Sequence, residues 1–263
     1  MSQQQLLPFF ALRFACVTLA CGACGACGQK IDLGSDVTWS TSHESGTYDD
    51  WLLPPGGNVF QNDGTKDTVS VVAGIAHTGQ YSLKLSNGGM SDMDGPAVYR
   101  ELVDPDEAYY SAWYYLPTSY VTKSQWTILK FRSRSDADAD VVSHGHDLNL
   151  RALPGGETIL YVYSHDPEYL QAPLANPPAF VPVAEWFHLE VLFRPRTDET
   201  GRLLVWLDDR LVYDLENRRT ADSTDVLWSP CSVGENVTPS PKVIYVDDAA
   251  ISHTRITRSG KPF

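Results

Sequence analysis

Short apolar runs recur along the chain from residue 68 onward. They are rich in Val, Tyr, Trp, Leu and Ile, and clusters of Gly, Pro, Asn and Asp separate them. Runs of this kind are typical of β-strands, and no stretch keeps the apolar period of a long helix. The predicted strands are 68–73, 81–85, 97–102, 109–116, 126–131, 147–152, 158–163, 187–194, 202–207, 210–215 and 243–252.

So many short strands, without an internal repeat, predict one all-β domain. We expect a two-sheet antiparallel β-sandwich of the jelly-roll type. Residues 203–213 predict a hairpin with Asp208 and Asp209 at its turn. The segments 132–146 and 167–185 are expected to be loops that border a functional cleft, because long ordered loops in compact domains are often functional.

The last predicted strand carries two adjacent carboxylates, Asp247 and Asp248. Neighbouring side chains on a strand point to opposite faces, so we expect one of the two to point inward. A buried carboxylate is costly unless it is paired or bound to a cation. The strand therefore predicts either a structural cation or the edge of a functional cleft.

The chain of 263 residues has 20 basic and 33 acidic side chains and a formal charge of −13. A field of this sign repels nucleic acid and anionic lipid. Because no basic stripe with interleaved aromatic residues opposes it, we expect no nucleic-acid partner. A polyanionic glycan would need a local basic cleft. Only Cys231 lies in the predicted domain, which excludes a disulfide within it.

The N-terminal residues 1–28 are interpreted as an export signal and tether. Their apolar stretch 6–20 is too short for a membrane span. The small residue before Cys21 resembles a bacterial lipoprotein signal, in which the cysteine is lipidated. We expect a cell-envelope lipoprotein held to the membrane only by this lipid, or else a secreted protein. Residues 29–37 then form a linker, 38–256 the jelly-roll domain and 257–263 a C-terminal tail.

Several motifs follow one another in a recognisable order. They are HESGTYDDW at 43–51, AHTGQYSLK at 76–84, YSAWYYLP at 110–117, WTILK at 126–130, WFHLE at 186–190, VWLDDRLV at 205–212 and IYVDD at 244–248. Over 38–256 the chain resembles the concanavalin-like/laminin-G-like jelly-roll superfamily, especially heparin-lyase-I-like polysaccharide lyases and jelly-roll carbohydrate-binding modules. The motifs are mostly structural, so the resemblance implies the fold more strongly than an activity.

The resemblance also implies a structural calcium ion. In many of these jelly rolls, the opening glutamate and the closing aspartate hold the ion, and Glu44 and Asp247 match them here. Calcium binds several oxygen ligands, so carboxylates from both chain ends, with nearby carbonyls, suit it. The alternative is that both acids face solvent or form salt bridges. No organic cofactor is expected.

A lyase reaction would need three groups at one site. In β-elimination on a uronate, a cation neutralises the carboxylate, a base removes the C5 proton and an acid protonates the leaving oxygen. Related lyases carry an Arg-x-Glu-Leu strand whose arginine faces the substrate, and residues 100–102 resemble it with one residue fewer. The candidates are Arg100 as the neutralising cation, His144 or His146 as the base, and Tyr161 or Tyr163 as the acid.

Side chains that suit sugar binding recur at every second position of two predicted strands. With Arg100, they are Asn149 and Arg151 on one strand and Tyr161, Tyr163 and His165 on the next. Together they predict an oligosaccharide surface on a concave sheet, although an ordinary solvated sheet face has the same pattern. Lys130 stands where related lyases often place glutamine, and the Glu-x-Asp-x-x-Glu run of family-16 hydrolases is absent.

The sequence thus predicts an exported carbohydrate-binding jelly-roll protein that recognises an extracellular polysaccharide. One alternative is a polysaccharide lyase that cleaves a uronate-containing glycan by β-elimination. A second alternative is a non-catalytic surface or adhesion protein without a sugar site.

Overall fold

The structure is a computed structural model that describes residues 36–53, 56–60, 67–88, 95–101, 106–122, 125–135, 138–165, 171–223, 226–234 and 236–259. The side chains of 60, 134, 135 and 138–144 are outside that description. The predicted export signal with Cys21, and most of the linker, also lie outside the described residues and stay predictions. Within the described part, no helix has the length and hydropathy that a membrane crossing requires.

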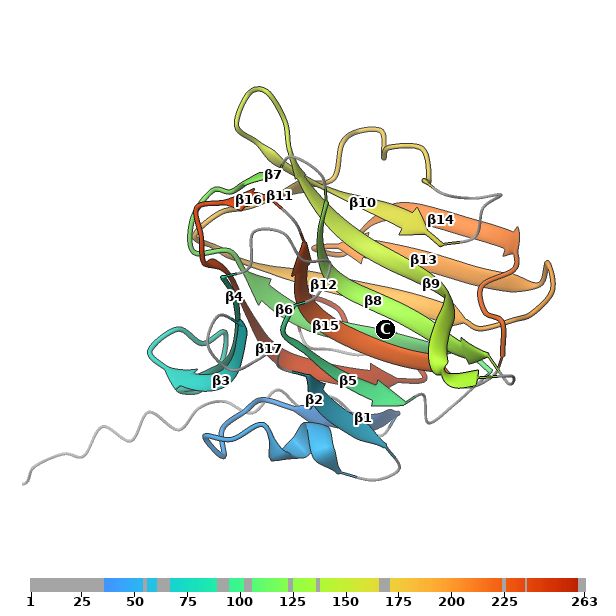
Figure 1. Cartoon of the computed structure of the whole chain (residues 1–263), viewed down its shortest axis with the longest axis horizontal. Coiled ribbons are helices and arrows are strands. Elements are labelled where there is room, and N and C mark those ends of the chain that lie inside the picture. The colour runs from blue at the N-terminus through green and yellow to red at the C-terminus, as the bar shows by residue number, and fades with distance from the viewer. Residues whose placement is uncertain are drawn as a thin grey trace, which may run out of the picture.

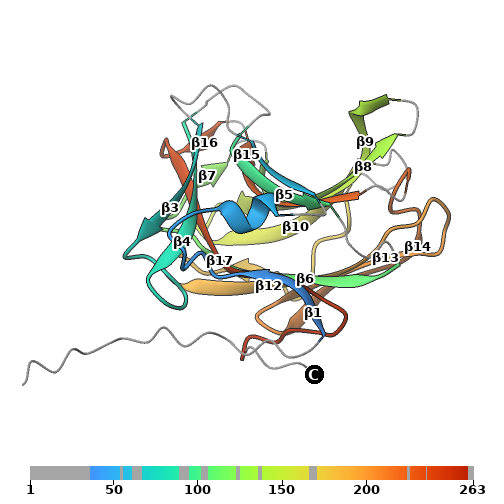
Figure 2. The same ribbon diagram turned by 90° about the horizontal axis from the view of Figure 1, so that it is seen from below.

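Two large antiparallel sheets stack face to face (Figures 1 and 2). The eight-stranded sheet has the order β14-β13-β12-β6-β17-β4-β3, and β1 pairs with β17. Its strands are β1 (Val37–Thr41), β3 (Asp67–Ala73), β4 (Tyr81–Asn87), β6 (Ala108–Tyr115), β12 (Trp186–Arg194), β13 (Gly201–Leu207), β14 (Arg210–Arg218) and β17 (Lys242–Ser252).

The seven-stranded sheet has the order β11-β10-β9-β8-β15-β5-β2. Its strands are β2 (Gly57–Phe60), β5 (Ala97–Glu101), β8 (Trp126–Ser135), β9 (Asp138–Ala152), β10 (Thr158–Ser164), β11 (Phe180–Val181) and β15 (Val226–Gly234). Two short strands, β7 (Val121–Thr122) and β16 (Val237–Thr238), pair separately, and η1 (Asp49–Leu52) is a single 3-10 turn.

The core lies between the two sheets. Phe131 of β8 stacks on Phe193 of β12 with ring centroids 4.3 Å apart, and Trp228 of β15 meets Tyr110 of β6 at 5.4 Å. All four side chains are buried, and burial of an aromatic ring contributes about 2–3 kcal/mol to folding. Cys231 is a free, buried thiol, so these contacts hold the sandwich together.

The predicted fold class is confirmed, and every predicted strand is present, although β8 and β9 are longer than predicted. The hairpin at 203–213 is confirmed as well, because β13 pairs with β14. Asp208 and Asp209 at its turn have φ angles of 48° and 65°. Positive φ at both central residues is the geometry of the type I′ turn that suits the twist of a two-residue hairpin.

Several segments differ from the prediction. The pattern missed β1, β2 and the two-residue strands β7, β11 and β16, of which β11 lies in the expected loop 167–185. It also missed β15, because its run contains Pro230, which lacks the N–H that a central strand donates. In the structure β15 lies between β8 and β5, and its register with β8 shifts between Pro230 and Val233. A bulge therefore accommodates the proline. The prediction of a loop over 132–146 is also wrong, because β8 and β9 extend through most of it.

Candidate functional site

The face of the seven-stranded sheet that points away from the core gathers several of the predicted polar side chains. Residues directly opposite each other on paired strands share a face. Tyr161 pairs with Asn149, and Tyr163 pairs with Asp147, whereas Leu148 between them points into the core. We call this face the outer face. Beside it, the ends of β8 and β9 rise away from the eight-stranded sheet (Figure 2).

Positive charge predominates on this part of the outer face. Lys130 lies opposite Asp147, and Arg132 lies opposite Gly145, while Arg151 follows Asn149 at a spacing of two on β9. All three basic side chains are partly exposed. Among the described side chains of β8, β9 and β10 on this face, three cations meet one carboxylate, a local surplus of positive charge in a chain of net −13.

An ionic network on the outer face joins β8, β9 and the end of β10. Arg132 Nη1 lies 2.5 Å from Asp147 Oδ1, and His165 Nε2 lies 2.9 Å from Asp147 Oδ2. The same Nε2 lies 3.0 Å from Arg132 Nη2. When Nε2 carries a proton it donates to the carboxylate, and when it does not it accepts from the guanidinium. His165 therefore keeps a partner in either protonation state.

The charge of Asp147 is stabilised by this network. Burial would by itself raise the pKa of the carboxyl, but the charge of Arg132 and the hydrogen bonds from His165 and Arg132 outweigh it. The pKa falls to about 2. Asp147 is thus ionised at any ordinary pH, and it holds the Arg132 and His165 side chains in fixed positions on the sheet.

The neighbouring side chains offer groups that contact sugars well. The Arg151 guanidinium lies over the Tyr161 ring at 5.1 Å, and the Tyr163 and His165 rings are perpendicular at 5.2 Å. Asn149 Oδ1 accepts a hydrogen bond of 2.7 Å from the Thr127 hydroxyl. Its Nδ2 has no hydrogen-bond partner among the described residues. Burial raises the pKa of Tyr161, although the charge of Arg151 opposes the shift, so its phenol stays a hydrogen-bond donor.

Arg100 does not lie on the outer face, contrary to expectation. It pairs with Trp228 of β15, whose ring is in the core, so the arginine side chain points between the sheets and is 1% exposed. Its guanidinium donates to the carbonyl of Leu53 and, at 3.4 Å, to that of Trp51, and it lies over the Trp39 ring at 5.1 Å. Arg100 therefore fixes the turn after η1 and does not face a ligand.

Of the two predicted histidine bases, His146 is not brought to the tyrosines. His146 lies on the core face of β9, because it is adjacent to Asp147 and side chains alternate. It is fully buried, and its ring is 6.0 Å from that of Phe193. His144 lies on β9, but its side chain is outside the described residues. Of the predicted histidines whose side chains the structure describes, His165 alone shares the outer face with Tyr161 and Tyr163.

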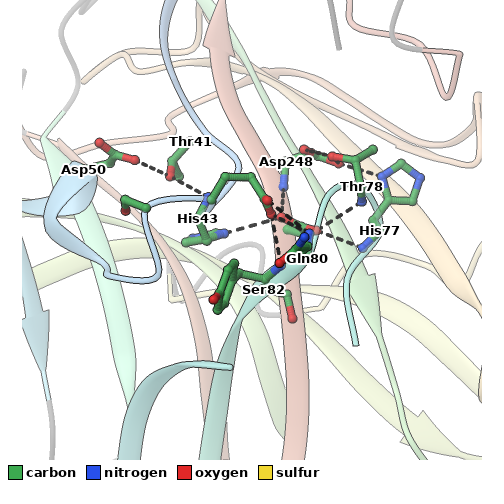
Figure 3. Close-up of polar contacts among 12 residues, drawn as sticks. Thr41, His43, Asp50, His77, Thr78, Gln80, Ser82 and Asp248 are labelled. Atoms are coloured by element: carbon green, nitrogen blue, oxygen red, sulfur yellow. Dashed lines mark hydrogen bonds and ion pairs between the residues drawn. The ribbon is translucent and has the colours of Figure 1, made fainter. Parts of the chain in front are cut away.

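A second polar cluster surrounds the predicted metal ligands (Figure 3). Glu44 accepts hydrogen bonds from the backbone N–H groups of Gln80 and Tyr81 at 2.9–3.0 Å. Asp247 accepts from the N–H groups of His77 at 2.8 Å and Thr78 at 3.3 Å. We call Glu44, Asp247, Asp248 and the loop 77–81 the closing-strand cluster. Through these hydrogen bonds, the loop binds Glu44 near the N-terminal end of the domain and Asp247 near its C-terminal end.

His43 extends this cluster into the core. The Trp51 indole N–H donates to His43 Nε2 at 3.1 Å, so that nitrogen carries no proton. The remaining ring nitrogen, Nδ1, then donates to Asp247 Oδ1 over 3.5 Å. Burial raises the pKa of Asp247, while the hydrogen bond from His43 opposes the shift and Asp248 adds to it.

Asp247 and Asp248 are both buried, although alternation along a regular strand would place them on opposite faces. The register of β17 shifts between Asp247 and Ala250, and Asp248 has a φ of 44°. Such a bulge breaks the alternation of the strand. It directs Asp248 toward His77 Nδ1 at 2.7 Å and the Thr78 hydroxyl at 2.8 Å.

The predicted calcium ion stays a prediction. Among the described residues, no group of three or more His, Cys, Asp and Glu side chains is arranged to hold a metal ion. Glu44 and Asp247 instead bind successive N–H groups of one loop. The connection between chain ends that calcium was expected to make is present here as direct hydrogen bonds.

Sequence reasoning missed the two residues that organise the outer face, Arg132 and Asp147. Arg132 was assigned to a loop, so its position opposite β9 was not anticipated. Asp147 precedes Asn149 and Arg151 at a spacing of two, and this spacing was a usable signal. The interaction with His165 was not visible, because it depends on how β9 and β10 pair.

Comparison with known proteins defines the fold class. No family model matches the chain, and no curated protein does. Among solved structures, it is similar to the cellulose-induced protein Cip1, with 17% identity, 83% of this chain and 98% of the other covered, and a TM-score of 0.56. It is also similar to alginate lyase Aly36B in complex with alginate trisaccharide, with 12% identity, coverage of 84% and 100%, and a TM-score of 0.54.

A third similar structure is the PL-14 alginate lyase from Aplysia kurodai, with 13% identity, coverage of 82% and 99%, and a TM-score of 0.54. At such identities the likeness concerns the fold. The chain has the two-sheet jelly-roll β-sandwich fold that these structures share.

Proposed function

We propose that the protein binds an acidic, uronate-containing polysaccharide along the outer face of the seven-stranded sheet. The observation that carries the proposal is the local surplus of cations there. Lys130, Arg132 and Arg151 share the face with two tyrosines, although the chain as a whole is strongly acidic. A local patch of one sign attracts ligands of the opposite sign even when the net charge repels them.

Each group on this face has a role in holding such a polymer. Guanidinium groups bind carboxylates through paired, charge-assisted hydrogen bonds. Tyr163, which is partly exposed, combines an apolar ring, on which the C–H face of a sugar can lie, with a hydroxyl that forms hydrogen bonds. Tyr161 is buried and its ring lies beneath Arg151, so it supports that guanidinium. Asp147 is not a ligand group in this proposal. It orients Arg132 and leaves Lys130 and Arg151 as the surplus charge.

The similar structures support this class of ligand. Alginate is a polymer of uronate units, and one of the alginate lyases was solved with an alginate trisaccharide. For the present chain we extend the proposal to export, with Cys21 as the lipidated residue of a cell-envelope protein. Replacement of Cys21 by Ala should release the protein from the membrane fraction. Equal membrane recovery of the two forms would overturn the anchor.

A β-elimination reaction at the same face is the second candidate, favoured by the contact between Tyr163 and His165. An outer-face cation would neutralise the uronate carboxylate and acidify the C5 proton. His165 would accept that proton, and Tyr163 would donate its proton to the leaving oxygen. The unsaturated uronate formed at the new chain end absorbs ultraviolet light, so its appearance separates a lyase from a binding protein.

The two candidates are tested with the same samples. The protein is incubated with alginate, glucuronan and heparin, while binding is measured by gel retardation and ultraviolet absorbance is followed. We expect retardation by at least one polymer. Rising absorbance that Tyr163→Phe abolishes, with retardation unchanged, establishes the lyase. Retardation without absorbance establishes the binding protein. The absence of retardation with every acidic polymer contradicts the proposed function and favours an adhesion protein without a sugar site.

A further inference from the structure

An exposed aromatic ring stands at the edge of the outer face. Phe180 belongs to β11, the last strand of the seven-stranded sheet, and half of it is exposed. A large apolar side chain so exposed loses the stabilisation of about 2 kcal/mol that burial would give it. It lies in the proline-rich segment 167–185, which the sequence marked as a candidate cleft border and for which the proposed function has no role.

The backbone around Phe180 fixes the direction of the ring. Phe180 pairs with Ile159 of β10, and the Leu160 N–H donates to the Ala179 carbonyl at 2.9 Å. Ala179 and Val181 on either side are buried in the core. Because side chains alternate along an extended chain, Phe180 points to the opposite side. That side is the outer face, which Ile159 shares with Arg151.

The segment that presents Phe180 is tied to the other sheet. Arg210, at the start of β14, donates to the carbonyl of Pro177 at 3.2 Å and to that of Pro178 at 3.0 Å. Proline also restricts the backbone of the segment. A ring held in advance in this way loses little conformational freedom when a ligand covers it, and preorganisation of this kind improves affinity.

Phe180 lies well apart from the ionic network. Ile159 and Tyr163 are four residues apart on β10, a distance of about 13 Å along the strand. Phe180 is one further strand away, so a single sugar unit cannot contact both the ring and the Tyr163–His165 pair. A chain of several sugar units that follows β10 can do so.

We propose that Phe180 forms an edge subsite that stacks against a sugar ring of the acidic polysaccharide, several units from the Arg132–Asp147–His165 network. This inference rests on the proposed function, because it requires a polysaccharide on the outer face. The ligand at the subsite is the apolar C–H face of a pyranose ring. Arg151 pairs with Ile159 from the side of β10 opposite to Phe180, and its guanidinium lies over the Tyr161 ring, so it is in position to contact the carboxylate of a sugar unit beside the one at the subsite.

A length series tests the subsite. Binding of alginate trisaccharide, hexasaccharide and polymer to the full chain is measured by calorimetry for wild type, Phe180→Ala and Phe180→Tyr. Leu211→Ala is the matched control, since Leu211 is an exposed apolar side chain on β14 of the other sheet. We expect Phe180→Ala to weaken hexasaccharide and polymer binding about tenfold, as for the loss of one stacked ring, and to leave the trisaccharide unchanged. Phe180→Tyr and Leu211→Ala should bind like wild type.

The outcomes separate the subsite from the proposed function. If wild type binds the polymer and Phe180→Ala binds every length equally well, the subsite is overturned while the outer-face proposal stands. If wild type binds none of the alginates and no glucuronan, the proposed function fails and the subsite fails with it. Because Phe180 is half exposed, unchanged melting temperatures are expected for its variants, so a loss of affinity reports on contact with the sugar.

Discussion

Two buried aspartates show how differently this protein uses a carboxylate. Asp147 on the outer face meets a guanidinium and an imidazole, and its pKa falls to about 2. Asp247 in the closing-strand cluster accepts hydrogen bonds from backbone N–H groups and His43, and burial together with Asp248 raises its pKa. The first carboxylate holds charged side chains in position, whereas the second holds a loop.

The difference indicates where a ligand binds. In the closing-strand cluster, the described carboxylates accept hydrogen bonds from the chain itself, so we assign the cluster a structural role. On the outer face, Asp147 balances one of three cations, and partly exposed positive charge remains beside two tyrosines. A polar cluster that satisfies its own groups stabilises the fold, while a cluster with surplus charge is suited to a partner.

The largest expected effect is the loss of the closing-strand carboxylate. Asp247→Ala leaves the N–H groups of His77 and Thr78 without their acceptor, and we expect a loss of stability on the order of 3–5 kcal/mol. Chemical denaturation measures it. Polymer binding should be unchanged under conditions where the variant is folded. A variant that keeps full stability but loses binding would reverse the roles of the two regions.

A smaller effect is expected from Asp147→Asn. A pKa lowered from 3.8 to about 2 corresponds to roughly 2 kcal/mol of stability at neutral pH. This contribution is complete above pH 4 and is lost as the pH falls toward 2, because the unfolded chain takes up the proton first. The variant should therefore show a flatter decrease in stability between pH 4 and pH 2.

The comparison variant for this change is Asp198→Asn, since Asp198 is exposed and accepts hydrogen bonds from Thr200 of its own turn. Those bonds lower the pKa of Asp198 as well, but full exposure to solvent weakens their effect on stability. Asp198→Asn should therefore flatten the decrease in stability between pH 4 and pH 2 much less than Asp147→Asn. If Asp147→Asn lost stability between pH 4 and pH 2 as steeply as wild type, the ionic network would not stabilise the fold. Asp247 should have the opposite effect on the pH dependence of stability, because burial raises its pKa. Its contribution to stability is present at low pH and is lost as the pH rises through its folded-state pKa.

The smallest effect is expected at Glu44. The hydrogen bonds that Glu44 accepts from Gln80 and Tyr81 are exposed to solvent, where water replaces a lost acceptor. Glu44→Ala should therefore lower the free energy of unfolding by only about 1 kcal/mol. Thermal melts with and without a chelator measure this cost and test the predicted calcium ion together. A chelator-dependent melting temperature in wild type, absent in Glu44→Ala, would establish the ion. No chelator effect in wild type would refute it.

The fold was accessible from the sequence because it depends on local signals. Alternating apolar strands and the Asp208–Asp209 turn are short-range patterns, and both were read correctly. The candidate site depends on which strands pair and in what register, and this is long-range information. Arg100 illustrates the difficulty, since an arginine on a strand reads as a surface residue. Only the contacts with Trp39 and the carbonyl of Leu53 show how a cation is satisfied between the sheets.

Tyr161 and Tyr163 share a face, as their spacing of two on one strand predicts, and the His165 ring contacts that of Tyr163 just beyond the end of β10. His146 was placed incorrectly, since the same rule puts it on the opposite face from Asp147. The bulge at Asp248 could not be anticipated either, because the run 244–251 contains its two aspartates without a glycine or proline that would mark a bulge.

The central claim is that the cations of the outer face bind an acidic polysaccharide, and calorimetric titration of alginate into a charge-reversal variant tests it most directly. Lys130→Glu with Arg151→Glu reverses the surplus charge, while Arg202→Glu reverses a partly exposed charge, ion-paired with Glu216, on the other sheet. We predict that wild type and Arg202→Glu bind alike and that the double variant binds at least about tenfold more weakly. Equal affinity of the double variant and wild type, with all three proteins folded, would contradict the account.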